Sequence, residues 1–282
     1  MNASLLDYIK SGSLYALPQH AISRIVYALT RIESPLVVPV IKGFSKVFGV
    51  DLNEAKQPNP ASYSSFNAFF TREIKPELRP LATTDIVSPV DGTVSQAGHI
   101  ESGRIFQAKG QTYTVQELLA CDAQQAAHFA EGQFATIYLS PRDYHRIHMP
   151  FTGTLSEQVH VPGRLFSVAP HTVKTVPRIF ARNERVVAHF DTEFGRMVMV
   201  LVGAINVAAI ETVWDGLVTP PKGKVVSKKS YDDGLVLEKG AEMGRFNMGS
   251  TIVLLMESRT PALSKKLVED MPVKMGQAIS DQ

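Results

Sequence analysis

Closely spaced β-rich runs fill much of the chain after Ile86, and they limit the folds that are open to it. Each run is short, rich in residues that favour strands, and bounded by residues typical of turns. The runs are TVSQAGHI, FATIYLS, HRIHMPFTGTLSEQVHV, RVVAHFDTE, RMVMVLVGAINVAAIETVW and STIVLLM. Strands that follow one another at such short intervals predict a largely antiparallel core, built as a sandwich or a barrel-like sheet.

The first 80 residues differ, because their apolar residues recur at helical spacing. Two amphipathic segments run from Ala21 to Ile32 and from Leu36 to Val50. Residues 1–50 carry five basic and two acidic residues, a net charge of +3. We therefore predict an α+β protein in which an N-terminal helical region, residues 1–80, precedes a β-rich domain, residues 81–282.

The role of these helices stays open at this stage. Amphipathic helices with basic flanks can lie in a membrane interface, but most such helices pack on a protein core. No segment is long enough to cross a bilayer, which takes ~20 consecutive apolar residues. The longest uncharged apolar stretch, Met197 to Ile210, has only 14 residues and predicts buried strands.

Charge and cysteine content exclude several classes of protein. The net charge of +2 is too small, and the basic residues are too scattered, for a nucleic-acid-binding protein. Cys121 is the only cysteine, so the chain has no intrachain disulfide, and we place it in a helix from Val115 to Phe129. Asp7 and Lys10 interrupt the N-terminus before a secretory signal can develop, which predicts a protein that starts in the cytosol.

Two polar clusters carry groups able to move protons. The first, SPVDGT, places Asp91 at an apparent tight turn, although an Asp-Gly pair is also an ordinary hairpin signal. The second, from Ser140 to Pro150, holds His145 and His148 three residues apart. Such a pair can share a metal on a helix, or both imidazoles can transfer protons near neutral pH. The spacing alone leaves both uses open.

A third cluster, KGAEMGRFNMGST, leads into the apolar run from Ile252 to Met256. Here the hydroxyl of Ser250 follows Gly249, which has no side chain to hinder attack on its carbonyl carbon. An ordinary turn before a strand would use the same two residues. The G-x-S-x-G elbow of α/β-hydrolases is absent, which counts against an ordinary serine esterase.

Taken together, the motifs resemble those of the phosphatidylserine decarboxylases. The similar segments are SPVDGTV, YLSPRDYHRIHMP, VPGRLFSV, FARNERV, FDTEFG, LVGAINVAAIETVW and KGAEMGRFNMGST, and they cover most of residues 62–257 in the family's order. Met248 departs from the Leu that family members more often carry before Gly-Ser-Thr. The tail beyond Ser258 matches little and carries no functional inference.

The resemblance implies a proenzyme that cuts itself. By motif, Asp91, His148 and Ser250 would act like the triad of a serine protease, with His148 taking the proton of the Ser250 hydroxyl. Attack on the Gly249 carbonyl would separate a β chain, residues 1–249, from an α chain, residues 250–282. Ser250 would end as an N-terminal pyruvoyl group, the covalent cofactor of the family, and no metal is implied.

The resemblance also implies the reaction. The amine of phosphatidylserine would form a Schiff base with the pyruvoyl group, carbon dioxide would leave, and phosphatidylethanolamine would result. His145 is the implied acid that returns a proton to the substrate carbon. A lipid substrate favours docking of the N-terminal helices on an anionic membrane surface, and we expect a peripheral protein on the cytoplasmic face of a bacterial inner membrane. The sequence does not decide between a monomer and a homodimer.

Two other functions compete with this one. A zinc hydrolase would use His145 and His148 as ligands, and it predicts an uncut chain that chelators inhibit. A membrane-bound binding module would use the turn around Asp91, and it predicts neither cleavage nor a reactive carbonyl group. Only the decarboxylase predicts two chains on a gel.

Overall fold

An antiparallel sheet of nine strands forms the centre of the chain as the structure describes it, a computed structural model covering residues 4–205, 209–220 and 225–281. Its strands are β1 (Gly92–His99), β4 (Gln133–Leu139), β6 (Gly153–Val161), β7 (Arg185–Thr192), β8 (Gly195–Val202), β11 (Ser227–Ser230), β12 (Val236–Leu237), β14 (Ser250–Met256) and β15 (Pro272–Val273). Their order is β11-β6-β7-β8-β14-β4-β1-β15, and β12 also pairs with β6. Strand β14 therefore lies in the interior of the sheet, between β8 and β4.

A second antiparallel sheet and a short hairpin complete the β structure of the described residues. The second sheet has the order β10-β9-β13-β5, with β5 (Arg146–His148), β9 (Ile210–Thr212), β10 (Gly216–Thr219) and β13 (Glu242–Phe246), and the hairpin joins β2 (Arg104–Ala108) to β3 (Gln111–Thr114). One apolar core includes side chains from both sheets, among them Ile147, Phe246 and Leu254. The predicted α+β class and antiparallel core are confirmed, and the large sheet does not close into a barrel.

The N-terminal region forms the predicted helices and one more before them. They are α1 (Leu5–Ala16), α2 (Gln19–Thr30) and α3 (Val37–Phe48), followed by short turns of helix η1 (Leu52–Glu54), η2 (Pro60–Ser62), α4 (Phe66–Phe70) and η3 (Pro76–Leu78). Ser4 begins α1 with a capping box, and Gly49 ends α3 in the left-handed conformation that glycine adopts readily. No helix of the described residues is long and apolar enough to cross a bilayer.

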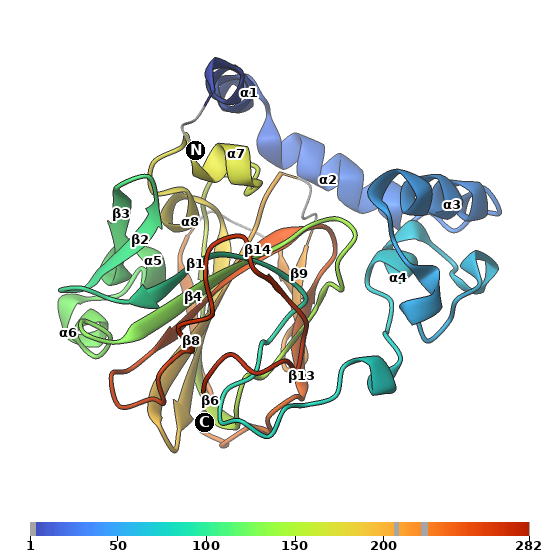
Figure 1. The fold of residues 1–282 in the computed structure, drawn as a ribbon. Helices are drawn as coiled ribbons and strands as arrows, with labels where there is room; N and C mark the ends of the chain where they lie inside the picture. The colour runs from blue at the N-terminus through green and yellow to red at the C-terminus, as the bar shows by residue number, and fades with distance from the viewer. Residues whose placement is uncertain (1–3, 206–208, 221–224, 282) are drawn as a thin grey trace.

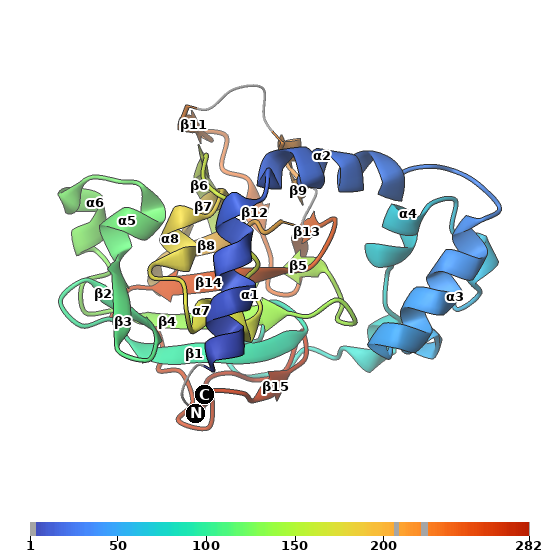
Figure 2. The same ribbon diagram turned by 90° about the horizontal axis from the view of Figure 1, so that it is seen from above.

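These helices lie along the outside of the β core. Figures 1 and 2 show α1 and α2 leading across it to α3 and α4, which stand to one side of the sheets. Helices α3 and α4 share an apolar cluster of their own, separate from the main core, that includes Ile41, Phe66, Phe69 and Phe70. Because the chain runs from α4 through η3 to Asp91, this smaller cluster connects the helical region to the segment that carries Asp91.

Two local predictions need correction. The helix expected from Val115 to Phe129 is broken into α5 (Val115–Leu119) and α6 (Ala123–Ala127), because Ala120 adopts a left-handed backbone with φ of 51°. Cys121 lies in this break and is only partly buried. A further segment, KGKVVSKK from Lys222 to Lys229, has a sequence that predicts an exposed hairpin, but it falls partly outside the described residues, and its described end contributes to β11. The remaining helices, α7 (Pro170–Val173) and α8 (Ile179–Arg182), are single turns.

Candidate active site

Ser250 is the first residue of β14, at the end of a strand buried on both faces. The strand pairs with β4 and β8 along its length, and Ser250 lies opposite Leu139. The serine is fully buried, and its hydroxyl donates a hydrogen bond to the carbonyl oxygen of Val202. The Gly249–Ser250 bond therefore lies where a loop enters the interior of the sheet, which fixes one side of the bond and leaves Gly249 outside the strand.

His145 lies against this bond. A Cβ added to Gly249 would lie 3.6 Å from His145 Nε2. The imidazole is fully buried and its ring centroid is 4.2 Å from that of Phe70. Its Nδ1 donates to the carbonyl oxygen of Asp143 over 2.8 Å, so Nε2 carries a lone pair in the neutral ring. Burial lowers the pKa of His145 to about 3, so the ring is uncharged at neutral pH.

The loop that carries His145 is held by Asp143. Its Oδ2 accepts hydrogen bonds of 2.6 Å from both the backbone N and the Oγ of Ser140, and this closes the turn around Pro141. Burial raises the pKa of the Asp143 carboxyl, an effect that the bonds from Ser140 oppose. The turn places the Asp143 carbonyl where it fixes the tautomer of the imidazole two residues on.

His148 lies on β5 and faces different partners. Its Nδ1 donates to the carbonyl oxygen of Gly240 over 2.8 Å, and its Nε2 accepts a hydrogen bond of 3.1 Å from the hydroxyl of Tyr144. Burial lowers the pKa of His148, so it too is held as a neutral ring. The Tyr144 hydroxyl thus occupies the nitrogen that would have to accept the proton of Ser250.

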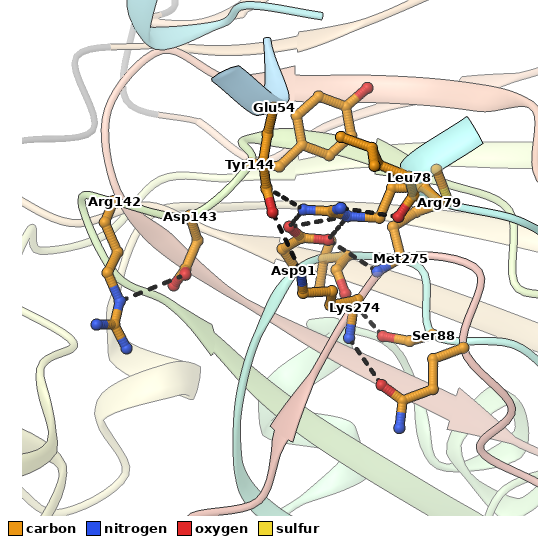
Figure 3. Close-up of polar contacts among 12 residues, drawn as sticks. Glu54, Leu78, Arg79, Ser88, Asp91, Arg142, Asp143, Tyr144, Lys274 and Met275 are labelled. Carbon is orange, nitrogen blue, oxygen red and sulfur yellow. Dashed lines mark hydrogen bonds and ion pairs between the residues drawn. The ribbon is translucent and has the colours of Figure 1, made fainter. Parts of the chain in front are cut away.

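Asp91 lies directly before β1 and is held by Arg79. Arg79 Nε donates to Oδ1 and Oδ2 over 2.9 and 3.1 Å, and Nη2 donates to Oδ2 over 2.6 Å. The backbone N of Met275 donates to Oδ1 over 2.8 Å. Arg79 also binds Glu54, whose other oxygen reaches Lys274, so four distant segments meet at one buried carboxylate, as Figure 3 shows.

The structure brings some of the predicted residues together and not others. Gly249, Ser250 and His145 are neighbours. No hydrogen bond joins Asp91 to His148 among the described residues, although the negative charge of Asp91 acts to raise the pKa of His148. Asp91 and His148 are linked indirectly, because Arg79, which binds Asp91, lines the same cavity as His148 and Tyr144.

The Asp91-Gly92 pair is not a hairpin turn. Gly92 begins β1, and a Cβ there would lie 2.4 Å from the carbonyl oxygen of Tyr138 on β4. The glycine is needed because the two backbones approach too closely for any side chain. This close approach holds Asp91 at the end of the paired strands.

Two cavities border the candidate site. An apolar cavity of about 140 Å³ is lined by Gly249 and Met248 beside the Gly249–Ser250 bond and by Phe44, Phe48 and Phe70 from the helical region. A larger, polar cavity of about 390 Å³ is lined by Arg79, Tyr144, His148 and Glu242. Within the described chain, no group of three or more His, Cys, Asp or Glu side chains is arranged to hold a metal ion.

Four contributors to the site were missed at the level of sequence. They are Arg72, Arg79, Asp143 and Tyr144, all buried or largely buried. Arg72 donates to the carbonyl oxygen of Arg142 over 3.0 Å, and its Nε and Nη1 have no partner among the described residues. The available signal was an arginine two residues after the apolar run FNAFF, since arginine is rarely buried without a specific role.

Comparisons with known proteins agree with one another. The family model described as phosphatidylserine decarboxylase matches residues 66–281, and a second model, described as PSD, matches residues 9–49. A phosphatidylserine decarboxylase proenzyme of Alkalilimnicola ehrlichii is 54% identical over 282 residues, covering 98% of this chain and 97% of the relative. Proenzymes of the same name from Shewanella frigidimarina and Xanthomonas euvesicatoria are 54% and 51% identical, covering 89% and 94% of this chain and 89% and 96% of the relatives.

Proposed function

This chain belongs to the phosphatidylserine decarboxylase family of carboxy-lyases, and from that premise we propose that it cuts itself between Gly249 and Ser250 and then decarboxylates phosphatidylserine. The observation that carries the proposal is the placement of this bond. It lies at the buried start of β14, against His145 and beside an apolar cavity. A reactive group made from Ser250 is thereby surrounded by groups that can bind a substrate and move protons.

Cleavage begins with the Ser250 hydroxyl. Its proton passes to His148, Oγ bonds to the Gly249 carbonyl carbon, and the C–N bond breaks to leave an ester and a free amine on residue 250. Two contacts must open first, because Ser250 Oγ donates to Val202 and His148 Nε2 is occupied by Tyr144. Asp91 supports the imidazolium through its negative charge, since no hydrogen bond joins the two in the uncut chain.

The second half of maturation breaks the ester. Loss of the Cα proton of residue 250 drives out the Gly249 carboxylate and leaves dehydroalanine, and water then replaces the nitrogen, which leaves as ammonia. The products are a β chain of residues 1–249 and an α chain of residues 250–282 that begins with a pyruvoyl group. Only serine fits this role, because its Oγ becomes part of the departing carboxylate.

The residues around the bond fit a pyruvoyl group. Residue 250 would be held by strand β14, and Gly249 lines the neighbouring apolar cavity, which offers space for a substrate beside the carbonyl. The pyruvoyl ketone supplies an electrophile that accepts the substrate amine and draws in electrons as carbon dioxide leaves. His145, the imidazole nearest to Gly249, returns a proton to the substrate carbon in this proposal, and its short distance from Gly249 supports that role.

We also propose that residues 1–80 dock the enzyme on an anionic membrane surface while residues 81–282 carry the catalysis. Helices α1 and α2 turn polar side chains such as Ser11, Gln19 and Ser23 inward. Their large apolar side chains face outward, for instance Leu5, Ile9, Ile25 and Leu29, each more than half exposed. A lipid surface is the partner that such an outward apolar face fits. We place the enzyme on the cytoplasmic face of a bacterial inner membrane.

Replacement of Ser250 by alanine tests the proposal. The Ser250→Ala protein should stay as one chain on a denaturing gel and release no carbon dioxide from phosphatidylserine, because no Oγ attacks Gly249. Ser264→Ala, a serine elsewhere in the α chain, is the matched control and should cut normally. A 33-residue fragment from Ser250→Ala would overturn the proposed maturation. Inhibition of the wild type by EDTA, reversed by zinc, would favour the hydrolase instead.

A further inference from the structure

His145 has a hydrogen-bonding position that the uncut chain leaves empty. Its Nδ1 is used by the Asp143 carbonyl, while the buried Nε2 has no partner among the described residues. Buried polar atoms are nearly always paired, so an unpaired one in an enzyme site calls for an explanation. The neighbour of Nε2 is Gly249, one of the two residues whose covalent bond is to be broken.

Burial and a nearby positive charge keep the His145 ring neutral before cleavage. Burial is the largest effect, and Arg72, which follows α4, adds a positive charge that also disfavours the imidazolium. On its own loop, Asp143 offers the ring only a carbonyl, because its carboxylate is bound to Ser140. No carboxylate pairs with His145 among the described residues, and the hydrogen bond to the Asp143 carbonyl opposes the effect of burial only in part, so the ring stays neutral in the uncut chain.

Cleavage adds the missing charge. Once the ester is eliminated, Gly249 ends in a carboxylate, where the uncut chain has a neutral amide. We propose that this new carboxylate becomes the partner of His145 Nε2 and converts the ring from a neutral acceptor into a protonated donor. The inference rests on the proposed function, because self-cleavage is what creates the group.

The direction of the effect follows from electrostatics. An opposite charge within ~4–6 Å favours the charged form, so the pKa of His145 rises from about 3 when the carboxylate appears. The ring takes up one proton from solvent as the pair forms and gives it to the substrate carbon that has lost carbon dioxide. Water then restores the proton before the next turnover. His145 is thus protonated, and able to act as the acid, only after the bond has been cut.

Histidine titration tests this directly. Protein labelled with ¹⁵N-histidine is compared by NMR as the uncut Ser250→Ala chain and as the cut wild type, between about pH 5 and pH 8. His145→Gln identifies the signal. We expect His145 to stay neutral throughout this range in the uncut chain and to titrate within it in the cut protein. His189 on β7, whose pKa burial lowers to about 4, serves as an internal control and should behave alike in both.

A second label identifies the partner. Glycine labelled with ¹³C at the carbonyl gives the cut protein a new carboxylate signal from Gly249. This signal should shift with the same midpoint as His145, and the step should vanish in His145→Gln. A cut protein in which His145 stays neutral, or in which the two midpoints differ, overturns the inference and leaves the proposed function standing. A wild-type chain that never cuts overturns both.

Discussion

Neighbouring residues of one motif have separate environments. His145 and His148 are three positions apart, yet His145 lies against Gly249 with a free Nε2, whereas His148 is bound on both nitrogens and lines the polar cavity with Arg79. Burial lowers both pKa values. Because both rings are neutral in the uncut chain, we expect position rather than basicity to separate their roles.

We expect the two histidines to separate maturation from turnover. His148→Ala should accumulate uncut chain, and Asp91→Asn should do so too, because each removes part of the base for Ser250. His145→Ala should still cut, but its decarboxylation rate should fall by ~10²–10⁴-fold without the proton donor. Cleavage is scored by gel and turnover by carbon dioxide release. Failure of His145→Ala to cut, or normal cutting by His148→Ala, would contradict this division.

Arg79 offers a second prediction at the scale of single residues. Its side chain is 3% exposed, and removing one partner of a buried ion pair costs about 3–5 kcal/mol, since the other charge is left unpaired. Arg79→Gln should therefore slow cleavage and lower the unfolding temperature. Arg79→Lys should have an intermediate effect, because lysine keeps the positive charge but cannot donate from two nitrogens to the Asp91 carboxylate. Lys56→Gln is the control, because the Lys56–Glu73 pair borders the same cavity but is exposed. Equal cleavage rates in all four proteins would show that Asp91 does not need Arg79.

At the scale of elements, the N-terminal helices have two features that one deletion would remove together, an exposed apolar surface and a share in a buried apolar cluster. Val37, Ile41 and Val50 are buried in the apolar cluster that also contains Phe70, and Phe70 packs on His145. Removal of residues 1–50 would therefore disturb the site as well as the outer surface. Substitutions confined to the exposed faces of α2 and α3 leave that cluster intact.

Replacing Leu29, Val40 and Val47 with serine should weaken binding to anionic vesicles by more than about tenfold. Each is more than half exposed, and burial of such a side chain contributes about 1.5–3 kcal/mol. Self-cleavage should not change. Val268→Ser, a similarly exposed apolar residue outside the helices, is the matched control in a vesicle sedimentation assay. Unchanged vesicle binding by the triple variant would show that these exposed apolar side chains do not contact the membrane.

At the scale of the whole molecule, the position of β14 decides what cleavage does to the fold. The strand follows the proposed cleavage site and pairs with β4 on one side and β8 on the other through nearly its full length. Strand β15 of the same product pairs with β1, and Met275 binds Asp91. The proposed α chain would therefore supply an interior strand of the large sheet, so the two products could not separate without exposing its core.

The cut protein should accordingly behave as a single folded unit. The 33-residue α chain should elute with the β chain in gel filtration under native conditions and separate from it only in denaturant. The uncut Ser250→Ala protein should elute at the same volume, because cutting one bond at the end of β14 leaves the sheet paired. Elution of a free α chain in native buffer would show that β14 does not hold the products together.

Much of this protein is determined by local sequence. The alternation of short strands and turns specifies an antiparallel sheet, and helical spacing specifies α2 and α3, because each depends on a few neighbouring residues. The Gly249-Ser250 pair is likewise local, since the attacking hydroxyl and the carbonyl belong to adjacent residues. Proline and glycine mark several boundaries, but Ala120 carries no such signal, and its left-handed backbone broke a predicted helix.

Only the tertiary structure decided which groups surround those residues. Asp91 is held by Arg79, 12 residues away, and by Met275, 184 residues away, while His145 rests on Phe70. The Asp-Gly pair is typical of a hairpin turn, but here Gly92 lies at a close contact between two strands, because the Tyr138 carbonyl of β4 approaches its backbone. Such contacts join segments whose separation along the chain says nothing about their distance in space. Hydrogen bonds and buried charges respond to that distance, so the partners of a catalytic group emerge only when the chain has folded.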